Sequence, residues 1–285
     1  MLKQRIITAL MLIPLVLGAL FFLPLKFFAL LAALIFLLAS REWGGFVATG
    51  SSQWLPLGFC LLLGASLLGL PVDQLWTPHL HPIVIGVLWC AVSWWLLGLL
   101  LVLRYPRSAE LWRSSTWLKS LFGLVTLVPF FWSLVAIRGY NFYHDPMMGA
   151  WILLFVMGLV WAADSGAYFF GKAFGKRKLA PAVSPGKTIE GMCGGLFTAS
   201  LLAIGVTWSM GFVPAKMFTV LFCSLLAVLA SVLGDLTESM FKREAGIKDS
   251  GNLLPGHGGI LDRIDSLTAA LPVFLLSYLL LSQEL

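Results

Sequence analysis

The chain has 285 residues and a net charge of +6, and 59% of its residues are hydrophobic while only 11% are charged. With 21 Phe, 12 Trp and a mean hydropathy of +0.93, this composition excludes soluble domains and favours a polytopic membrane protein. It does not indicate nucleic-acid binding, because the basic residues lie at the boundaries of apolar segments.

Apolar segments recur along the whole chain, and an apolar helix needs about 20 residues to cross a bilayer. The predicted spans are 6–23, 25–40, 54–70, 84–103, 117–137, 149–171, 191–211, 216–238 and 264–282. We therefore expect an all-α polytopic membrane protein of about nine transmembrane helices. It would form one continuous membrane domain, with an N-terminal scaffold (1–148) and a C-terminal catalytic region (149–285).

The N-terminal charges Lys3 and Arg5 precede an apolar stretch, as in a signal peptide. No small-residue cleavage site follows before the next span, so we expect a retained first helix. With a cytoplasmic N-terminus and alternating spans, every Lys and Arg lies on the cytoplasmic side except Lys26, Arg138 and Lys216. The charged loops should therefore face the cytoplasm.

Asp164 lies late in the sixth predicted span, where an ionisable group costs several kcal/mol unless it is paired, hydrated or metal-bound. Tyr168 and Lys172 follow at i+4 and i+8 and share its helical face. We interpret Asp164 as a functional residue and a candidate metal ligand. The alternative is a hydrogen-bonded aspartate that holds helices together.

Residues 171–195 form a predicted cytoplasmic loop that contains five cations and several glycines. Its core, SPGKTIEG at 184–191, offers hydroxyl groups, an ammonium group and flexible backbone just before an apolar helix, which favours phosphate binding. The alternative is an ordinary basic loop with turn residues. It is not a P-loop, because Pro181 stands where that motif requires glycine.

The stretch 234–266 holds four of the seven aspartates of the chain. Asp235, Glu238, Ser239 and Lys242 share one face of a predicted helix, and Asp262 begins a second helix beyond a glycine-rich loop. Two helix ends should therefore present carboxylates toward this loop. Such carboxylates form an all-oxygen site suited to Mg²⁺, and nearby cations can offset negative charge that develops during a reaction.

Three segments of this stretch closely resemble the signature of phosphatidate cytidylyltransferases (CDP-diacylglycerol synthases): SMFKR at 239–243, KD at 248–249 and PGHGGILDRID at 255–265. The preceding Gly234-Asp235 and the upstream SPGKTIEG are similar to bacterial members of that family. The specific match covers about residues 160–268. The resemblance implies a magnesium-dependent transfer of a cytidylyl group from CTP to phosphatidic acid, which yields CDP-diacylglycerol and pyrophosphate.

We assign candidate roles from the residues and the resemblance together. The candidate metal ligands are Asp164, Asp235, Asp262 and Asp265. The candidate catalytic residues are Lys187, Lys242, Arg243, Lys248, Asp249, His257 and Arg263. The candidate substrate-binding residues are Ser184, Lys187, Thr188, Gly258 and Gly259. We expect His257 to order the loop or contact phosphate. For Glu190 and Glu238, positioning and purely structural roles remain equal alternatives.

The implied cofactor is Mg²⁺, with a second cation left open, and the implied substrates are CTP and phosphatidic acid. The chain should also contact membrane lipids, and a homodimer is an open alternative. We expect it in the bacterial cytoplasmic membrane, with the site facing the cytoplasm.

Three other functions are disfavoured by the sequence. A transporter or channel is disfavoured because the acidic residues cluster at one side and no related halves are seen. A phosphotransferase that uses a CDP-lipid as donor resembles a DGxxAR…GxxxDxxxD pattern, which this chain lacks. A purely structural scaffold would not require four aspartates around a glycine-rich loop.

Overall fold

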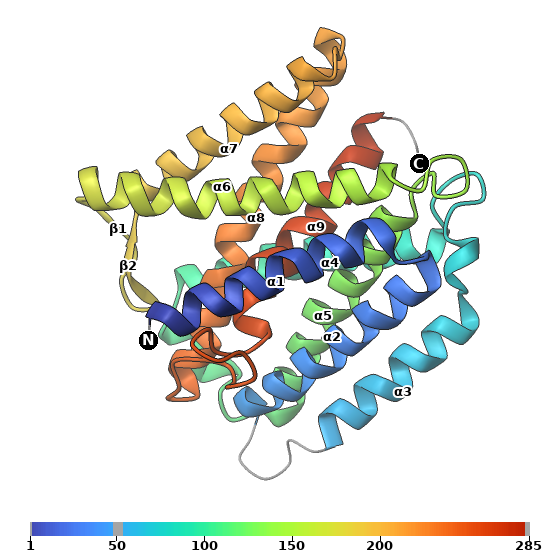
Figure 1. Ribbon diagram of the computed structural model, residues 1–285. Helices are drawn as coiled ribbons and strands as arrows, with labels where there is room; N and C mark the ends of the chain where they lie inside the picture. The colour runs from blue at the N-terminus through green and yellow to red at the C-terminus, as the bar shows by residue number, and fades with distance from the viewer. Residues whose placement is uncertain (1, 48–53, 283–285) are drawn as a thin grey trace.

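The computed structural model describes residues 2–47 and 54–282, which form nine α-helices, two short 3-10 helices and one β-hairpin (Figure 1). The α-helices are α1 (Leu2–Phe22), α2 (Leu25–Val47), α3 (Trp54–Gly69), α4 (Pro82–Leu103), α5 (Thr116–Gly139), α6 (Met148–Phe174), α7 (Ile189–Ser209), α8 (Pro214–Glu244) and α9 (Leu261–Ser282). The 3-10 helices are η1 (Val72–Gln74) and η2 (Arg107–Leu111), and the strands are β1 (Lys178–Ala180) and β2 (Ser184–Thr188). The predicted N-terminal region begins with Met1 and the predicted C-terminal region ends with residues 283–285. These residues lie outside the described ones.

Each predicted span coincides with one of these helices. Six of them, α4 to α9, are long and apolar enough to cross a membrane, and shorter apolar stretches lie at Leu10–Phe22 and Trp54–Gly69. The prediction of a helical membrane protein is therefore confirmed. The number of nine crossings stays a prediction, because the length and composition of the described helices support six.

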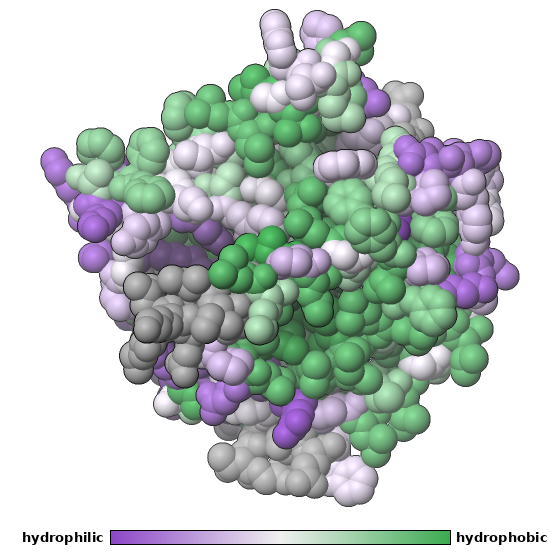
Figure 2. Space-filling model, in the orientation of Figure 1, coloured by the Kyte–Doolittle hydropathy of each residue, from purple (hydrophilic) through white to green (hydrophobic). Residues whose placement is uncertain are grey.

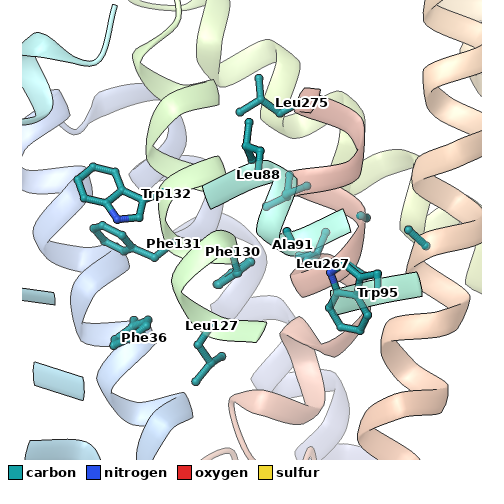
Figure 3. Close-up of a cluster of buried hydrophobic side chains, with 14 of the residues drawn as sticks. Phe36, Leu88, Ala91, Trp95, Leu127, Phe130, Phe131, Trp132, Leu267 and Leu275 are labelled. Atoms are coloured by element: carbon teal, nitrogen blue, oxygen red, sulfur yellow. The ribbon is translucent and has the colours of Figure 1, made fainter. Parts of the chain in front are cut away.

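The core surrounds α5, which packs against α2, α4, α6 and α9. Figure 3 shows Phe130, Phe131 and Leu127 of this helix among buried side chains of its neighbours. Phe36 of α2 meets Phe131 edge to face, with ring centroids 6.2 Å apart. The opposite side is filled by residues of α4 and α9: Leu88, Ala91, Trp95, Leu267 and Leu275. Burial of this apolar surface and close packing hold the scaffold together.

Helices α6 and α7 lie unusually close because glycines line their contact. A Cβ atom at Gly195 would lie 2.6 Å from the carbonyl oxygen of Ala163, and one at Gly191 would lie 2.8 Å from that of Ala167. Small residues allow the backbones of membrane helices to approach in this way. A separate apolar cluster joins these two helices to α8: Leu159, Ala163, Ala199, Ala203 and Val228.

The prediction of a loop over 171–195 is wrong in three respects. Its first four residues complete α6, its last seven begin α7, and β1 pairs antiparallel with β2 through the register Lys178↔Thr188 and Ala180↔Ser184. Two strands this short are marginal in water by themselves. Here the turn residue Val183 is only 1% exposed and packs into the main apolar cluster, so tertiary burial stabilises the hairpin.

The surface in Figure 2 is hydrophobic across the middle of the face, and hydrophilic residues gather at the left beside the hairpin and at the right beside the connection into α6. This distribution is typical of a folded protein with an apolar central band that lies in lipid and two polar sides that meet water. Figure 1 shows the hairpin, the C-terminal end of α8 and the loop before α9 on the same side of the molecule.

Candidate active site

The hairpin brings Lys187 to α8. Thr188 ends β2 and caps α7, because its hydroxyl oxygen accepts a hydrogen bond from the N–H of Gly191 at 3.1 Å. From the preceding position, the ammonium group of Lys187 forms an ion pair with the carboxylate of Asp235, and both side chains are partly exposed. The other oxygen of Asp235 accepts a hydrogen bond from the hydroxyl of Ser239 at 3.2 Å. The structure thus joins two of the segments that the sequence singled out.

A cavity of about 390 Å³ lies beside this ion pair, between α6, the hairpin, α7 and α8. Asp164, Lys172 and Lys187 supply its charged groups, and Asp164 interacts electrostatically with both Lys187 and Asp235. Tyr168 also lines the cavity, which confirms that it shares a helical face with Asp164 and Lys172. We call this the polar cavity.

The glycines of the SPGKTIEG segment have separate roles. Gly191 faces Ala167 of α6, where a side chain would not fit. Gly186 lines the polar cavity with nothing within 4 Å of the place of a Cβ atom, so its backbone is open to a ligand. Thr188 is buried and its hydroxyl serves as the helix cap, while Ser184 opens β2. Phosphate binding by this segment stays a prediction, and the open backbone at Gly186 is compatible with it.

A second charged cluster lies where α8 meets α9. Lys242 donates hydrogen bonds to Oε2 of Glu238 at 2.9 Å and to Oδ1 of Asp262 at 2.8 Å. These three side chains are only 13%, 4% and 6% exposed, so the single positive charge of the lysine is shared between two buried carboxyl groups. Asp262 also accepts hydrogen bonds from the N–H groups of Ser250 and Gly259. Both of its oxygens therefore have protein donors.

Asp265 lies one helical turn beyond Asp262 and interacts with Glu238 and Asp235. Its Oδ1 accepts a hydrogen bond from the N–H of Ser266 at 2.7 Å. Oε1 of Glu238 is buried with no hydrogen-bond partner. This oxygen and the carboxylates of Asp235 and Asp265 are all oxygen donors, which is the ligand type that Mg²⁺ prefers.

The four predicted metal ligands do not converge on one point. Across residues 2–47 and 54–282, no three His, Cys, Asp or Glu side chains lie close enough together to hold a metal ion. Asp235 is paired with Lys187, Asp262 is held by Lys242, and Asp164 faces the polar cavity. The metal assignment therefore stays a prediction.

The remaining candidate residues lie in or beside the loop that joins α8 to α9. The guanidinium group of Arg243 donates to the carbonyl of Val183 at 3.2 Å and so ties the hairpin to α8. Arg263 donates to the carbonyl of His257 at 3.0 Å, and Nδ1 of His257 is buried with no hydrogen-bond partner. Lys248 is exposed. These contacts show how the loop is held, and leave catalytic roles as predictions.

Asp249, Gly258 and Gly259 belong to the same loop. Asp249 is exposed at the beginning of the loop. Gly258 has a φ of +81°, which favours glycine, and a Cβ atom there would lie 2.5 Å from Oδ2 of Asp262. Gly259 donates its N–H to the same oxygen at 2.7 Å. The two glycines thus bring the backbone close to Asp262, and their predicted binding of substrate is untested.

Glu42, near the end of α2, belongs to this site although the sequence analysis passed over it. Its side chain is buried, and its carboxylate accepts hydrogen bonds from the N–H groups of Ile260 and Leu261 and from the hydroxyl of Ser250. The available signal was a carboxylate that follows an apolar run after only Ser40 and Arg41. Its partners lie more than 200 positions away, so no local pattern could identify them.

A second cavity, of about 650 Å³, lies between α4, α8, α9 and the hairpin. Its lining is almost wholly apolar, with Tyr105 at one side. The hydroxyl of Tyr105 donates to Glu244 at 2.9 Å, and burial together with this hydrogen bond raises the pKa of Tyr105 to about 12. Leu179, Met192 and Val232 line both cavities, so the two cavities are adjacent.

Comparison with known proteins places this sequence in a family. The model of the cytidylyltransferase family matches residues 3–281. Over 286 residues the chain is 47% identical to a Haemophilus influenzae protein named phosphatidate cytidylyltransferase, with 96% of this chain and 97% of the relative covered. A Pseudomonas aeruginosa protein of the same name is 45% identical over 274 residues, with 96% of each chain covered.

A Staphylococcus haemolyticus protein of that name is 37% identical over 193 residues, which cover 61% of this chain and 74% of the relative. The first two relatives extend the likeness far beyond residues 160–268, into the half that the sequence analysis treated as apolar scaffold. The resemblance inferred from the motifs is therefore confirmed. The chain belongs to the cytidylyltransferase family and is a nucleotidyltransferase.

Proposed function

We propose that this protein transfers a cytidylyl group from CTP to phosphatidic acid and releases pyrophosphate, in the biosynthesis of phospholipids. The observation that carries the proposal is the pair of adjacent cavities: one contains the charged groups of Asp164, Lys172 and Lys187, the other is apolar, and three residues line both. Such a shape suits a ligand with a phosphate headgroup and acyl chains. The names of the close relatives support the same reaction.

The chemistry joins two anions. A phosphate monoester has a second pKa of about 6, so the lipid phosphate is largely ionised at neutral pH and needs no strong base. One of its oxygens attacks the α-phosphorus of CTP, the bond from that phosphorus to the bridging oxygen breaks, and pyrophosphate leaves with the electron pair. The main barrier is charge repulsion, which fixed cations lower.

The residues of the chain provide these cations. Lys187 and Lys172 line the polar cavity, where they would contact the phosphates of the two substrates. Asp235 holds the ammonium group of Lys187 in place until a phosphate competes for it. Lys242 is enclosed by two carboxylates, so we assign it to the organisation of the site.

We propose that Asp235 and Asp265 would hold Mg²⁺ together with the substrate phosphates, because Mg²⁺ is usually bound by only one or two carboxylates in such sites. Asp262 is the weakest of the predicted ligands, because its oxygens already accept from Lys242 and from two backbone N–H groups. When bound, the ion would supply charge neutralisation at the phosphoryl oxygens.

The orientation of the site is part of the proposal. The distribution of Lys and Arg predicts that the hairpin, the end of α8 and the loop before α9 face the cytoplasm. CTP and pyrophosphate could then exchange with water, while phosphatidic acid keeps its chains in the cytoplasmic membrane.

The decisive experiment incubates the purified protein in detergent with cytidine-labelled CTP, phosphatidic acid and Mg²⁺. We expect the label in the lipid fraction, whereas label confined to the aqueous phase would overturn the proposal. Asp265→Asn should abolish turnover and the stabilisation by Mg²⁺ against thermal unfolding. The control Asp145→Asn alters an exposed loop carboxylate on the far side of the molecule and should retain both. Normal turnover in Asp265→Asn would remove Asp265 from the metal site.

A further inference from the structure

The carboxylate of Glu42 connects α2 to the loop that carries the charged cluster. Its Oε1 accepts from the N–H of Ile260 at 3.0 Å, and its Oε2 accepts from the N–H of Leu261 at 2.7 Å and from the hydroxyl of Ser250 at 3.1 Å. The residue is only 6% exposed. These three donors offset the lost hydration of the carboxylate, because burial of a carboxylate without partners would be costly.

The two backbone donors lie at the beginning of α9, where N–H groups have no partner within the helix. A carboxylate placed there also interacts favourably with the positive end of the helix. Glu42 therefore acts as a cap supplied by another helix. Its own position is fixed, because the indole N–H of the adjacent Trp43 donates to the carbonyl of Lys119 on α5 at 2.9 Å.

Two glycines allow the loop to reach this carboxylate. At Gly251 the three nearest atoms to an added Cβ all belong to Glu42, the closest being Oε1 at 2.6 Å. At Gly259 the nearest atoms belong to Glu42 and Ser250. Any larger residue at either position would displace the carboxylate or the loop. The loop is thus fitted to Glu42 on two sides.

The contacts continue from Glu42 to the charged cluster. The N–H of Ser250 donates to Asp262, whose carboxylate accepts from Lys242, which in turn donates to Glu238. A shift of Ser250 or of the first turn of α9 would therefore move Asp262 and, through Lys242, the carboxylate of Glu238.

We propose that Glu42 is a positioning residue for the reaction: it fixes the loop of residues 250–261 and the start of α9, and so sets the geometry of the Glu238–Lys242–Asp262 cluster and of Asp265. The inference rests on the proposed cytidylyl transfer. It assigns a role in the site to the N-terminal region of the chain, which the motifs did not reach.

The first test measures the kinetics of Glu42→Gln, which keeps the shape of the side chain and removes its charge. Misplacement of supporting groups commonly costs about 10- to 100-fold, so we expect kcat to fall by that factor while KM for CTP and for phosphatidic acid stays within about threefold. The control Ser40→Ala removes a buried hydroxyl that bonds only within α2, and should keep wild-type kcat. Wild-type kcat in Glu42→Gln would overturn the inference.

The second test is a double-mutant cycle between Glu42 and Gly251, with kcat as the measured quantity. Gly251→Ala should lower kcat in the wild-type background, because the added methyl group meets Glu42. In the Glu42→Ala background that clash is gone, so the same change should have little further effect. The control Gly45→Ala, with nothing within 4 Å, should be neutral in both backgrounds.

Additive effects of Gly251→Ala and Glu42→Ala would overturn the inference. If Glu42→Gln does not fold, Ser250→Ala removes one of the three donors and should give the same fall in kcat with KM unchanged. A wild-type protein that does not transfer label to lipid would refute the proposed function instead, so the two failures can be told apart.

Discussion

Lys242 offers the sharpest test of how the charged cluster is held together. Its ammonium group lies between Glu238 and Asp262, at 2.9 and 2.8 Å, and all three side chains are almost fully buried. Lys242→Met retains most of the side-chain volume and removes the charge. Glu238 would then lose its ammonium partner, whereas Asp262 would keep the N–H groups of Ser250 and Gly259.

The magnitude follows from these contacts. Two charge-assisted hydrogen bonds contribute about 1.5–3 kcal/mol each, and removal of one partner from a buried ion pair typically costs about 3–5 kcal/mol. We expect Lys242→Met to lower the free energy of unfolding by about 3–5 kcal/mol. Since most of the penalty comes from the uncompensated carboxylate of Glu238, Lys242→Met/Glu238→Gln should be more stable than Lys242→Met alone.

The assay is unfolding by SDS in mixed micelles, followed by circular dichroism. Lys26→Met is the matched control, because Lys26 also forms an ion pair, with Asp73 at 2.7 Å, but these side chains are 71% and 36% exposed and should contribute little. An unchanged midpoint for Lys242→Met, or a double variant less stable than the single one, would refute the reasoning.

Three further predictions concern other parts of the molecule. Gly195→Ala should destabilise by about 1–3 kcal/mol through its clash with the carbonyl of Ala163, whereas Gly205→Ala in the same helix, with free space around it, should stabilise by about 0.5–1 kcal/mol; equal SDS midpoints would contradict this. Burial and the bond to Glu244 raise the pKa of Tyr105 from 10.0 to about 12, so its contribution to stability is complete below pH 10 and lost as pH rises toward 12; Tyr105→Phe should remove a late component from the alkaline absorbance titration, and an unchanged titration would count against it. Chelation of divalent ions should stop label transfer and Mg²⁺ should restore it, while transfer that persists in chelator would exclude a metal requirement.

Local patterns in the sequence were sufficient to predict the positions of the helices and the polar face of α8 in the site. The apolar runs predicted the position of every described α-helix, because burial in lipid demands continuous hydrophobic length. The i, i+3, i+4, i+7 spacing predicted that Asp235, Ser239, Glu238 and Lys242 share a face, and the contacts of Ser239 with Asp235 and of Lys242 with Glu238 confirm it. These are properties of a single helix.

Features that depend on contacts between remote segments could not be predicted. The hairpin forms because Val183 finds a buried place beside distant helices, which the pattern of 171–195 does not show. The glycines at 191 and 195 suggested a ligand loop, yet they are required by the approach of α6. The partners of Glu42 are set by the fold alone.

The contact between α2 and α9 has a consequence for biogenesis. Glu42 is synthesised 218 residues before Ile260, so during most of synthesis its carboxylate lacks the backbone donors of α9. Only after the last helix inserts can the charge be enclosed. A chain that ends before α9 therefore lacks the two backbone donors that satisfy this carboxylate, and leaves it without the partners that its burial requires.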